Sequence, residues 1–505
     1  MKKVMLGFGI AAMVLSAAAK IELGTPFSDG VVLQRGMQVP VWGKAAPGHK
    51  ITLKFAGNAV STIVDSNGCW KAMLPAMSAS KEGRTLRVTE CAPGYFLDSV
   101  RESVEVKDVL VGEVWFASGQ SNMECPIWGG NTRYRDGKGA LMTAMTCLPY
   151  VRFAKNARAW SAEPSRAQSS GWKRFEPESF RQCELSAVAF YYARELYLAL
   201  DVPIGIVDSS WGGTNIDAWT PRCGYEGCEK SIQATADYPV KKGWRAKTDR
   251  RGPIVGAGQQ PTVLFNGMVA SWAPMAMRGY IWYQGCHNSG ESHLYRAKLH
   301  ALYNGWSKAF ANPDLKLYLV QLAPYKQNWM GICTAQNQFV AEQRNAALAV
   351  TADVGNFDDI HPNDKEVVAK RLVVHALKRD YGFAIPEDDS PIFKAATFGA
   401  DGCVTVDFAH AMNWYVYVAN RSHEVAFEVA GTNGVWEAAR IVNFRKARGR
   451  NKRMFDTDYI DGAKIVVKSD KVAAPVKVRY MGRPRTAGTL YNQASLPLGP
   501  FEAAK

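Results

Sequence analysis

The sequence predicts an α/β protein whose helix-containing core is flanked by two regions of β-strands. The chain has 505 residues, of which 47% are hydrophobic, so it is long enough for two to four domains with buried cores. Short strand-like runs occupy both ends of the chain, whereas strand-like and helix-like segments alternate in the middle. We therefore expect a signal segment at 1–19, an N-terminal β domain at 20–107, an α/β domain at 108–388 and a C-terminal β region at 389–505.

The first 19 residues have the pattern of a cleaved export signal. Lys2 and Lys3 precede an apolar run from Val4 to Val14, and three alanines follow at 17–19. The apolar run is shorter than the roughly 20 residues that a membrane-spanning helix needs. We expect an exported protein, periplasmic, at the cell surface or secreted, without a membrane span.

The predicted elements follow the hydrophobic pattern along the chain. The N-terminal region contains short β-runs such as Ile51–Phe55, separated by turn pairs such as Asn67-Gly68. Strands return after about residue 388. In the middle, apolar runs predict strands and a spacing of three to four residues predicts helices. The predicted core strands are 109–117, 204–207, 280–283 and 317–322, the predicted helices lie around 188–196 and 365–377, and the C-terminal strands are 404–406, 415–418 and 464–467. This alternation favours a parallel sheet with its ligand site at the carboxyl ends of the strands.

Charge and cysteine content narrow the function classes. The formal net charge of +15 favours anionic partners in general but does not identify a particular one. The densest basic segment lacks the interleaved aromatic residues of nucleic-acid sites, so we interpret it as a solvated loop and expect no nucleic-acid partner. The ten cysteines form no CxxC pair, so no zinc site is predicted, and their disulfide pairing stays open. The basic residues of that segment are Arg445, Lys446, Arg448, Arg450, Lys452 and Arg453.

Two of the four segments that can carry chemistry supply a hydroxyl and backbone amides. Gly119-Gln120-Ser121-Asn122-Met123 places Ser121 on a tight turn after the 109–117 strand, where a serine can be a nucleophile or a helix cap. It matches only part of the GxSxG pattern, because Met123 stands where the second glycine belongs. Gly212 and Gly213 follow the strand at 204–207, where an amide of Gly213 can stabilise an oxyanion or simply form a turn.

The other two segments supply an amide side chain and a base. Asn288 follows the strand at 280–283 and can donate to an oxyanion. The adjacent Cys286 and His287 point apart on an extended chain, which disfavours a cysteine hydrolase. His361 follows Asp358 and Asp359, so a carboxylate can fix its tautomer while the far ring nitrogen acts as base; a surface turn or half of a metal site fits locally as well.

Together the four segments resemble the Ser, Gly, Asn and His blocks of SGNH hydrolases, and specifically the sialate O-acetylesterase family of carbohydrate esterases. Further similar segments are Val32–Arg35, Phe265–Met268, Val320–Ala323 and Leu496–Phe501, so the resemblance covers most of the chain. It implies a three-layer α/β/α core flanked by β-sandwich-like regions. One departure is that Cys286 and His287 stand where the family usually has Glu and Ser.

The resemblance implies hydrolysis of O-acetyl esters on sialic acid or a related sugar, without metal or organic cofactor. Ser121 is then the nucleophile and His361 the base, with Asp358 or Asp359 as its orienting residue. The amides of Ser121 and Gly213 and the side chain of Asn288 form the oxyanion hole. We also expect Gln120 and Gln284 to bind substrate. The alternatives are an esterase for acetyl-xylan or another glycan, and a catalytically silent glycan-binding protein. No pattern in the sequence indicates an oligomeric state.

Overall fold

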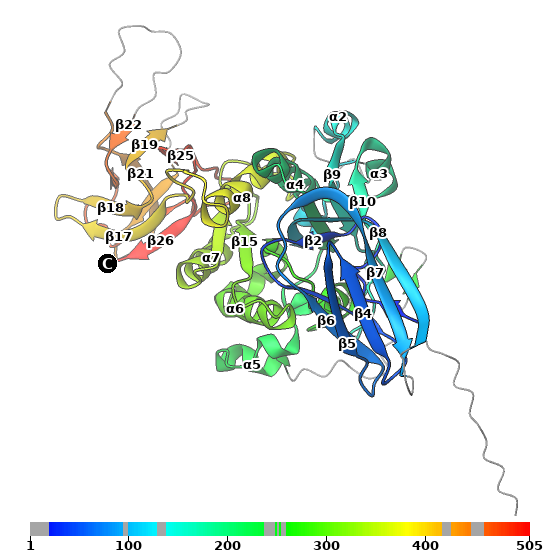
Figure 1. Ribbon diagram of the computed structural model, residues 1–505. Helices are drawn as coiled ribbons and strands as arrows, with labels where there is room; N and C mark the ends of the chain where they lie inside the picture. Colours follow the sequence, from blue (N-terminus) through cyan, green and yellow to red (C-terminus); the bar gives the residue numbers. More distant parts are fainter. Residues whose placement is uncertain are drawn as a thin grey trace, which may run out of the picture.

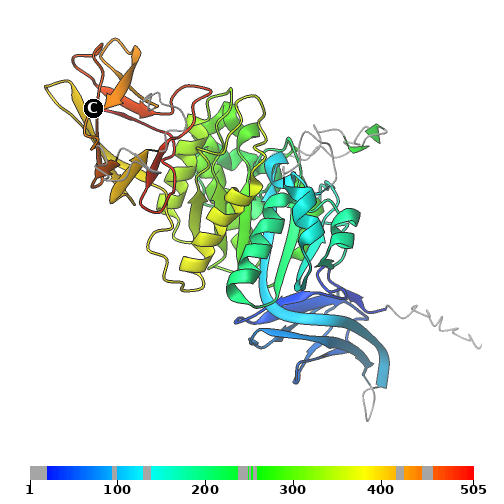
Figure 2. The same ribbon diagram turned by 90° about the horizontal axis from the view of Figure 1, so that it is seen from above.

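The computed structural model describes residues 20–93, 99–128, 138–236, 248–249, 252–253, 259–416, 426–445 and 459–505. The predicted signal segment 1–19 and most of the basic segment at 445–453 lie outside these residues. Figure 2 shows the N-terminal strands, the helix-containing core and the C-terminal strands in a row. The prediction of an α/β protein is confirmed, because a parallel sheet with helices forms the core.

The N-terminal region consists of two groups of strands (Figure 1). One is a three-stranded sheet in the order β1-β3-β6. In the other, β4 pairs with β5 and β7, and β7 pairs with the long strand β8. The strands are β1 (Glu22–Leu23), β2 (Val32–Gln34), β3 (Val39–Lys44), β4 (Lys50–Phe55), β5 (Asn58–Ile63), β6 (Cys69–Leu74), β7 (Ser80–Ala92) and β8 (Ser99–Gly119).

Strand β8 joins the N-terminal strands to the core sheet. Its first half pairs antiparallel with β7, and its second half lies at the centre of the parallel sheet. At Asp108 the backbone has a φ of 54°, which aspartate tolerates better than most residues, and the Asp108 carboxylate accepts hydrogen bonds from Arg152 and Arg174. The domain boundary predicted at 107 therefore falls inside one continuous strand, and the domain bounds stay a prediction.

The core sheet has the order β10-β9-β11-β8-β14-β15-β16, parallel except for β10. Successive side chains of a strand point to opposite faces. Trp115 of β8 packs on Tyr192 of helix α4 (Ala187–Leu200), whereas Phe116 packs on Trp306 of helix α6 (Ser292–Ala309), so helices cover both faces. The strands are β9 (Leu148–Lys155), β10 (Lys173–Phe175), β11 (Ile204–Ser210), β14 (Gly279–Tyr283), β15 (Lys316–Val320) and β16 (Ala346–Ala349), with a separate pair β12 (Thr248–Asp249) and β13 (Gly252–Pro253).

Both helices that the sequence predicts are present, at 187–200 and 365–379. Helix α4 packs against α8, and α6 packs against α7. The helices are α1 (Ser121–Glu124), α2 (Gly139–Met145), α3 (Pro177–Gln182), α4 (Ala187–Leu200), α5 (Lys230–Ala236), α6 (Ser292–Ala309), α7 (Met330–Glu342) and α8 (Lys365–Arg379). Within the described residues no helix combines the length and the apolar character needed to cross a bilayer.

The C-terminal region forms a seven-stranded and a three-stranded sheet. Their orders are β17-β18-β23-β21-β20-β24-β26 and β22-β19-β25. The strands are β17 (Ile392–Phe398), β18 (Cys403–Ala409), β19 (Asn413–Val416), β20 (Phe427–Ala430), β21 (Trp436–Ile441), β22 (Tyr459–Asp461), β23 (Lys464–Lys468), β24 (Lys477–Tyr480), β25 (Leu490–Asn492) and β26 (Phe501–Ala504). The predicted strands at 404–406 and 464–467 lie within β18 and β23.

A buried carboxylate lies where α8 meets the chain that leads to these sheets. Asp388 accepts hydrogen bonds from Arg379 Nε at 2.6 Å and His375 Nδ1 at 3.1 Å, and Lys378 Nζ lies 2.9 Å away. Burial by itself would raise the pKa of Asp388, but the hydrogen bonds from His375 and Lys378 and the charge of Arg379 hold that pKa well below its usual value. The folded state therefore stabilises the ionised form of Asp388.

Candidate active site

Three of the four candidate segments leave adjacent strands at one edge of the sheet. Strand β8 lies between β11 and β14, and its last residue, Gly119, is in register with Ser210 and with Tyr283. Since these strands are parallel, the turns that follow them start side by side. The fourth segment, which carries His361, follows β16 and precedes α8.

Gly119 brings Ser121 to this edge. It has a φ of 139°, and a Cβ at this position would lie 2.3 Å from the carbonyl oxygen of Tyr283. A side chain at this position would collide with that carbonyl unless the backbone shifted. The chain turns at Gly119 and begins helix α1 at Ser121, and the Gln120 backbone N–H donates to the Tyr283 carbonyl. The strained turn places the Ser121 hydroxyl outside the end of the sheet.

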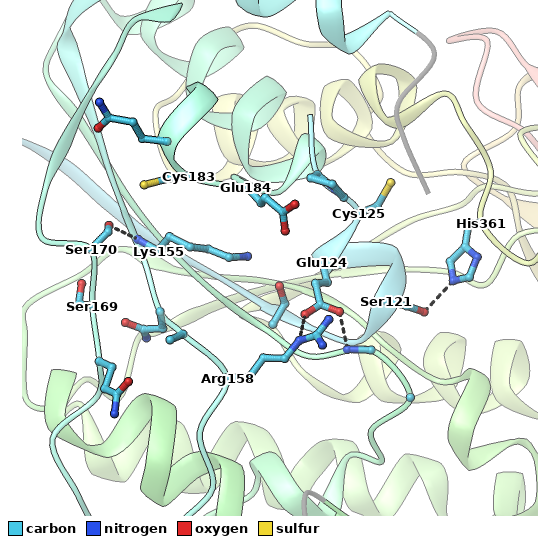
Figure 3. Close-up of a pocket in the computed structure, with 18 residues that line it drawn as sticks. Ser121, Glu124, Cys125, Lys155, Arg158, Ser169, Ser170, Cys183, Glu184 and His361 are labelled. Carbon is cyan, nitrogen blue, oxygen red and sulfur yellow. Dashed lines mark hydrogen bonds and ion pairs between the residues drawn. The ribbon is translucent and has the colours of Figure 1, made fainter. Parts of the chain in front are cut away.

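Ser121, His361 and Asp359 form a hydrogen-bonded row. The Nε2 of His361 lies 2.9 Å from the Ser121 Oγ (Figure 3), and its Nδ1 lies 3.1 Å from Asp359 Oδ1. The same carboxylate oxygen accepts the His361 backbone N–H at 3.0 Å, which fixes the loop under the ring. With Nδ1–H donating to the carboxylate, Nε2 is left to accept the serine proton.

A buried contact ties the histidine loop to the serine helix. Asn122 donates from Nδ2 to the carbonyl oxygen of Ile360 at 3.0 Å. Lys365, which is fully buried, donates from Nζ to Asn122 Oδ1 at 2.6 Å. Asn122, which directly follows Ser121, is therefore tied to Ile360, which directly precedes His361.

Asp358 lies apart from this row. Its side chain is 78% exposed and pairs with Arg485 of the C-terminal region, with 2.6 Å between Oδ1 and Nη2. The sequence left both aspartates open as partners of His361. In the structure the contact with His361 Nδ1 comes from Asp359.

Ser121 and His361 line an open cavity of about 970 Å³, together with Gly212 and Gly213 of the turn after β11. Most of the other residues that line it carry polar or charged side chains. A volume in this range is typical of small-molecule sites. The charged side chains of the wall are Glu124, Lys155, Arg158 and Glu184.

Gln120, Gln284 and Asn288 are absent from the described lining of this cavity, and all three are buried in internal hydrogen bonds. Gln120 Oε1 accepts the backbone N–H of Gly285, and Gln284 donates to Thr214 and to Asn288. Neither side chain lines the described cavity, and the substrate contacts expected for Gln120 and Gln284 stay a prediction.

Asn288 connects two loops below the cavity. Its Oδ1 accepts the Ile216 backbone N–H at 3.1 Å, and its Nδ2 donates to Glu291 Oε1 at 2.5 Å. Glu291 in turn pairs with the buried Lys298 at 2.7 Å. The oxyanion contact expected of Asn288 therefore competes with a charge-assisted hydrogen bond.

The sequence analysis singled out none of the four charged residues of the cavity wall, and two of them, Glu124 and Arg158, contact each other. Glu124 lies one turn after Ser121 on α1, and its carboxylate contacts Arg158 (Figure 3). The spacing of three residues from Ser121 was a usable signal for Glu124. Arg158 follows β9, which the sequence analysis did not predict, so nothing in the pattern placed it near the serine.

The thiol of Cys286 has the properties of a core residue. Burial raises its pKa to about 12, so it stays protonated near neutral pH, and a thiol is a far weaker nucleophile than a thiolate. This agrees with the prediction that Cys286 and His287 do not work together as nucleophile and base. None of the ten cysteines, all of which the structure describes, forms a disulfide.

Comparisons with known proteins point to one group of enzymes. The family model "Carbohydrate esterase, sialic acid-specific acetylesterase" matches residues 111–373. The sialate O-acetylesterases of Pongo abelii and Homo sapiens are each 26% identical over 409 residues, which is 73% of this chain and 72% of theirs. A carbohydrate acetylesterase from Xanthomonas citri has a similar crystal structure, with a TM-score of 0.78 and 30% identity, over 96% of this chain and 100% of that one.

Proposed function

Because the chain belongs to the sialic acid-specific acetylesterase family of carbohydrate esterases and is therefore an esterase, we propose that it removes O-acetyl groups from sialic acid or a related acidic sugar with Ser121 as nucleophile. The observation that carries this proposal is the 2.9 Å contact between Ser121 Oγ and His361 Nε2 at the rim of the cavity. The core is then of the SGNH hydrolase type, with β-sandwich-like regions on either side.

The reaction proceeds through an acetyl-enzyme. His361 Nε2 takes the Ser121 proton while Oγ attacks the acetyl carbonyl carbon. The tetrahedral intermediate collapses, the sugar oxygen leaves with the proton from His361, and the acetyl group stays on Ser121. A water molecule, deprotonated by His361, then attacks this ester, acetate is released, and the proton on His361 Nε2 passes to the departing Ser121 Oγ. Asp359 keeps the Nδ1 proton in place and stabilises the imidazolium that forms in both steps.

The oxyanion is stabilised by backbone amides in this proposal. Ser121 and Gly213 both line the cavity, so their N–H groups can point at the same carbonyl oxygen. Loss of one such donor typically costs about 10²–10³ in turnover. We assign Asn288 to the support of this site, since its amide nitrogen already donates to Glu291.

Arg158 supports an acidic sugar over a neutral one. Its side chain is 55% exposed at the cavity, its Nε is held by Glu124 at 2.6 Å, and the guanidinium lies over the Trp211 ring at 6.0 Å. A guanidinium held in this way can present its Nη atoms to a carboxylate as a planar fork. Sialic acid carries a carboxylate and xylan sugars do not, so acetyl-xylan is the second candidate.

Two measurements test the proposal. We expect the Ser121→Ala protein to lose at least about 10³-fold in the rate of acetate release from an aryl acetate. Wild-type rates on that substrate for Ser121→Ala would refute the role of Ser121. Acetate release from O-acetylated sialosides should exceed release from acetylated xylan, and the reverse order would favour the second candidate. A protein that binds these glycans without any turnover would contradict esterase chemistry altogether.

A further inference from the structure

We propose that Glu124 is a positioning residue that holds the Gly212-Gly213 turn against the serine helix. This inference rests on the proposed function, because its consequence is measured on the Ser121 reaction. Glu124 Oε2 accepts the backbone N–H of Gly212 at 2.8 Å, and Glu124 Oε1 accepts Arg158 Nε at 2.6 Å. One carboxylate thus joins three segments that are far apart in the chain.

The contact between helix and turn is close. A Cβ on Gly212 would lie 3.0 Å from Glu124 Oε2 and 3.1 Å from the Ser121 Cβ. Glu124 is three residues after Ser121, so both side chains lie near one face of α1. The turn therefore has little freedom to approach Ser121 further, and the hydrogen bond from Gly212 to Glu124 keeps it from moving away.

Arg158 offsets the charge of Glu124. The Glu124 side chain is 18% exposed and lies beside the place where the reaction develops an oxyanion. A bare carboxylate there would oppose that negative charge, whereas a carboxylate paired with a guanidinium opposes it much less. The attraction between the Arg158 guanidinium and the Trp211 ring beneath it keeps Arg158 in this position.

The reaction depends on this contact through Gly213. Its amide follows the Gly212 residue that Glu124 holds, so a displaced turn moves an oxyanion donor. Such a displacement weakens binding of the transition state and leaves binding of a small substrate almost unchanged. Misplacement by about 1 Å can cost about 10²-fold in rate.

The test compares Glu124→Ala, Glu124→Gln and the control Glu178→Ala in the full-length protein. Glu178 is an exposed glutamate of α3 that pairs with Arg181. For hydrolysis of an aryl acetate we expect Glu124→Ala to lower kcat about 10- to 100-fold with KM within about twofold. Glutamine keeps an acceptor for the Gly212 N–H, so Glu124→Gln should recover most of that loss. The control should keep wild-type kcat.

A boronic acid provides a readout that a general loss of stability would not move. Its tetrahedral adduct with Ser121 places an oxygen where the oxyanion forms. The affinity of Glu124→Ala for phenylboronic acid should fall by about the factor by which its kcat/KM falls. Gly212→Ala perturbs the same contact from the other side and should show the same pattern, which covers the case that Glu124→Ala fails to fold.

The outcomes separate the two proposals. If Ser121→Ala is inactive and both Glu124→Ala and Gly212→Ala keep kcat within twofold of wild type, the positioning role is refuted and the proposed function stands. If Glu124→Gln is as slow as Glu124→Ala, the hydrogen bond to Gly212 is not the cause and the positioning role is likewise refuted. If Ser121→Ala retains wild-type activity, the proposed function itself fails.

Discussion

The adjacent aspartates 358 and 359 allow a matched test of which carboxylate supports His361. The change is Asp359→Ala, with Asp358→Ala as its control. With 3.1 Å between Asp359 Oδ1 and His361 Nδ1, the attraction between a carboxylate and an imidazolium is about 5 kcal/mol at a dielectric constant of about 20. The Asp359 side chain is 23% exposed, so water screens roughly half of this.

The remaining 2.5 kcal/mol or so corresponds to a loss of about 10²-fold in kcat/KM for Asp359→Ala. Asp358 is exposed and paired with Arg485, so Asp358→Ala should stay within about twofold of wild type. The assay is aryl acetate hydrolysis at fixed ionic strength, with thermal unfolding to show that both variants are folded. Equal losses in the two variants, or an Asp359→Ala protein with more than a third of wild-type activity, would refute the reasoning.

Two further predictions concern stability. Because the folded-state pKa of Asp388 is lowered, its ionised form stabilises the fold fully above the unfolded-state pKa of about 4. This contribution begins to fall as the pH drops below about 4 and is lost only as the pH passes the much lower folded-state pKa. Asp388→Asn should therefore lower the free energy of unfolding by about 3 kcal/mol at pH 7 and by about 1 kcal/mol less at pH 3, as measured by urea unfolding; an equal effect at both pH values would contradict this. Gly119→Ala should lower Tm by several degrees and reduce activity, because its Cβ collides with the Tyr283 carbonyl, whereas Gly290→Ala, which meets open space, should leave Tm unchanged.

The hydrophobic pattern predicted those strands and helices whose residues are typical of their secondary structure. The segment 204–207 is a short apolar run and the segment 365–377 has apolar residues spaced three to four apart, and the structure has them as β11 and α8. Strand β16 was missed because its sequence is Ala346-Ala-Leu-Ala, and alanine favours helices. Its place in the sheet comes from pairing with β15 and from burial on both faces, which local propensity does not encode.

The candidate site was predictable where strand ends determine position. Parallel strands bring their following turns together, so Ser121 and the Gly213 turn could be expected side by side. The polar residues Gln284 and Asn288 could not be assigned in this way, because a buried amide that binds a loop has the same sequence pattern as one that faces a ligand. The choice between Asp358 and Asp359 also depends on the path of one loop, in which the Asp359 side chain accepts the backbone N–H of His361.

Strand β8 makes the position of Ser121 depend on a ladder that begins in the N-terminal strands. A slip of one residue between β8 and its neighbours would shift Ser121 by about 3.3 Å, more than its hydrogen bond to His361 can tolerate. The same slip would exchange the faces of Trp115 and Phe116 and so remove each from its helix. A shortened chain that starts at residue 108 would lose the pairs that β7 makes with Val109 and Val111 and those that β2 makes with 110–112, so the N-terminal strands contribute directly to the ladder that ends at Ser121.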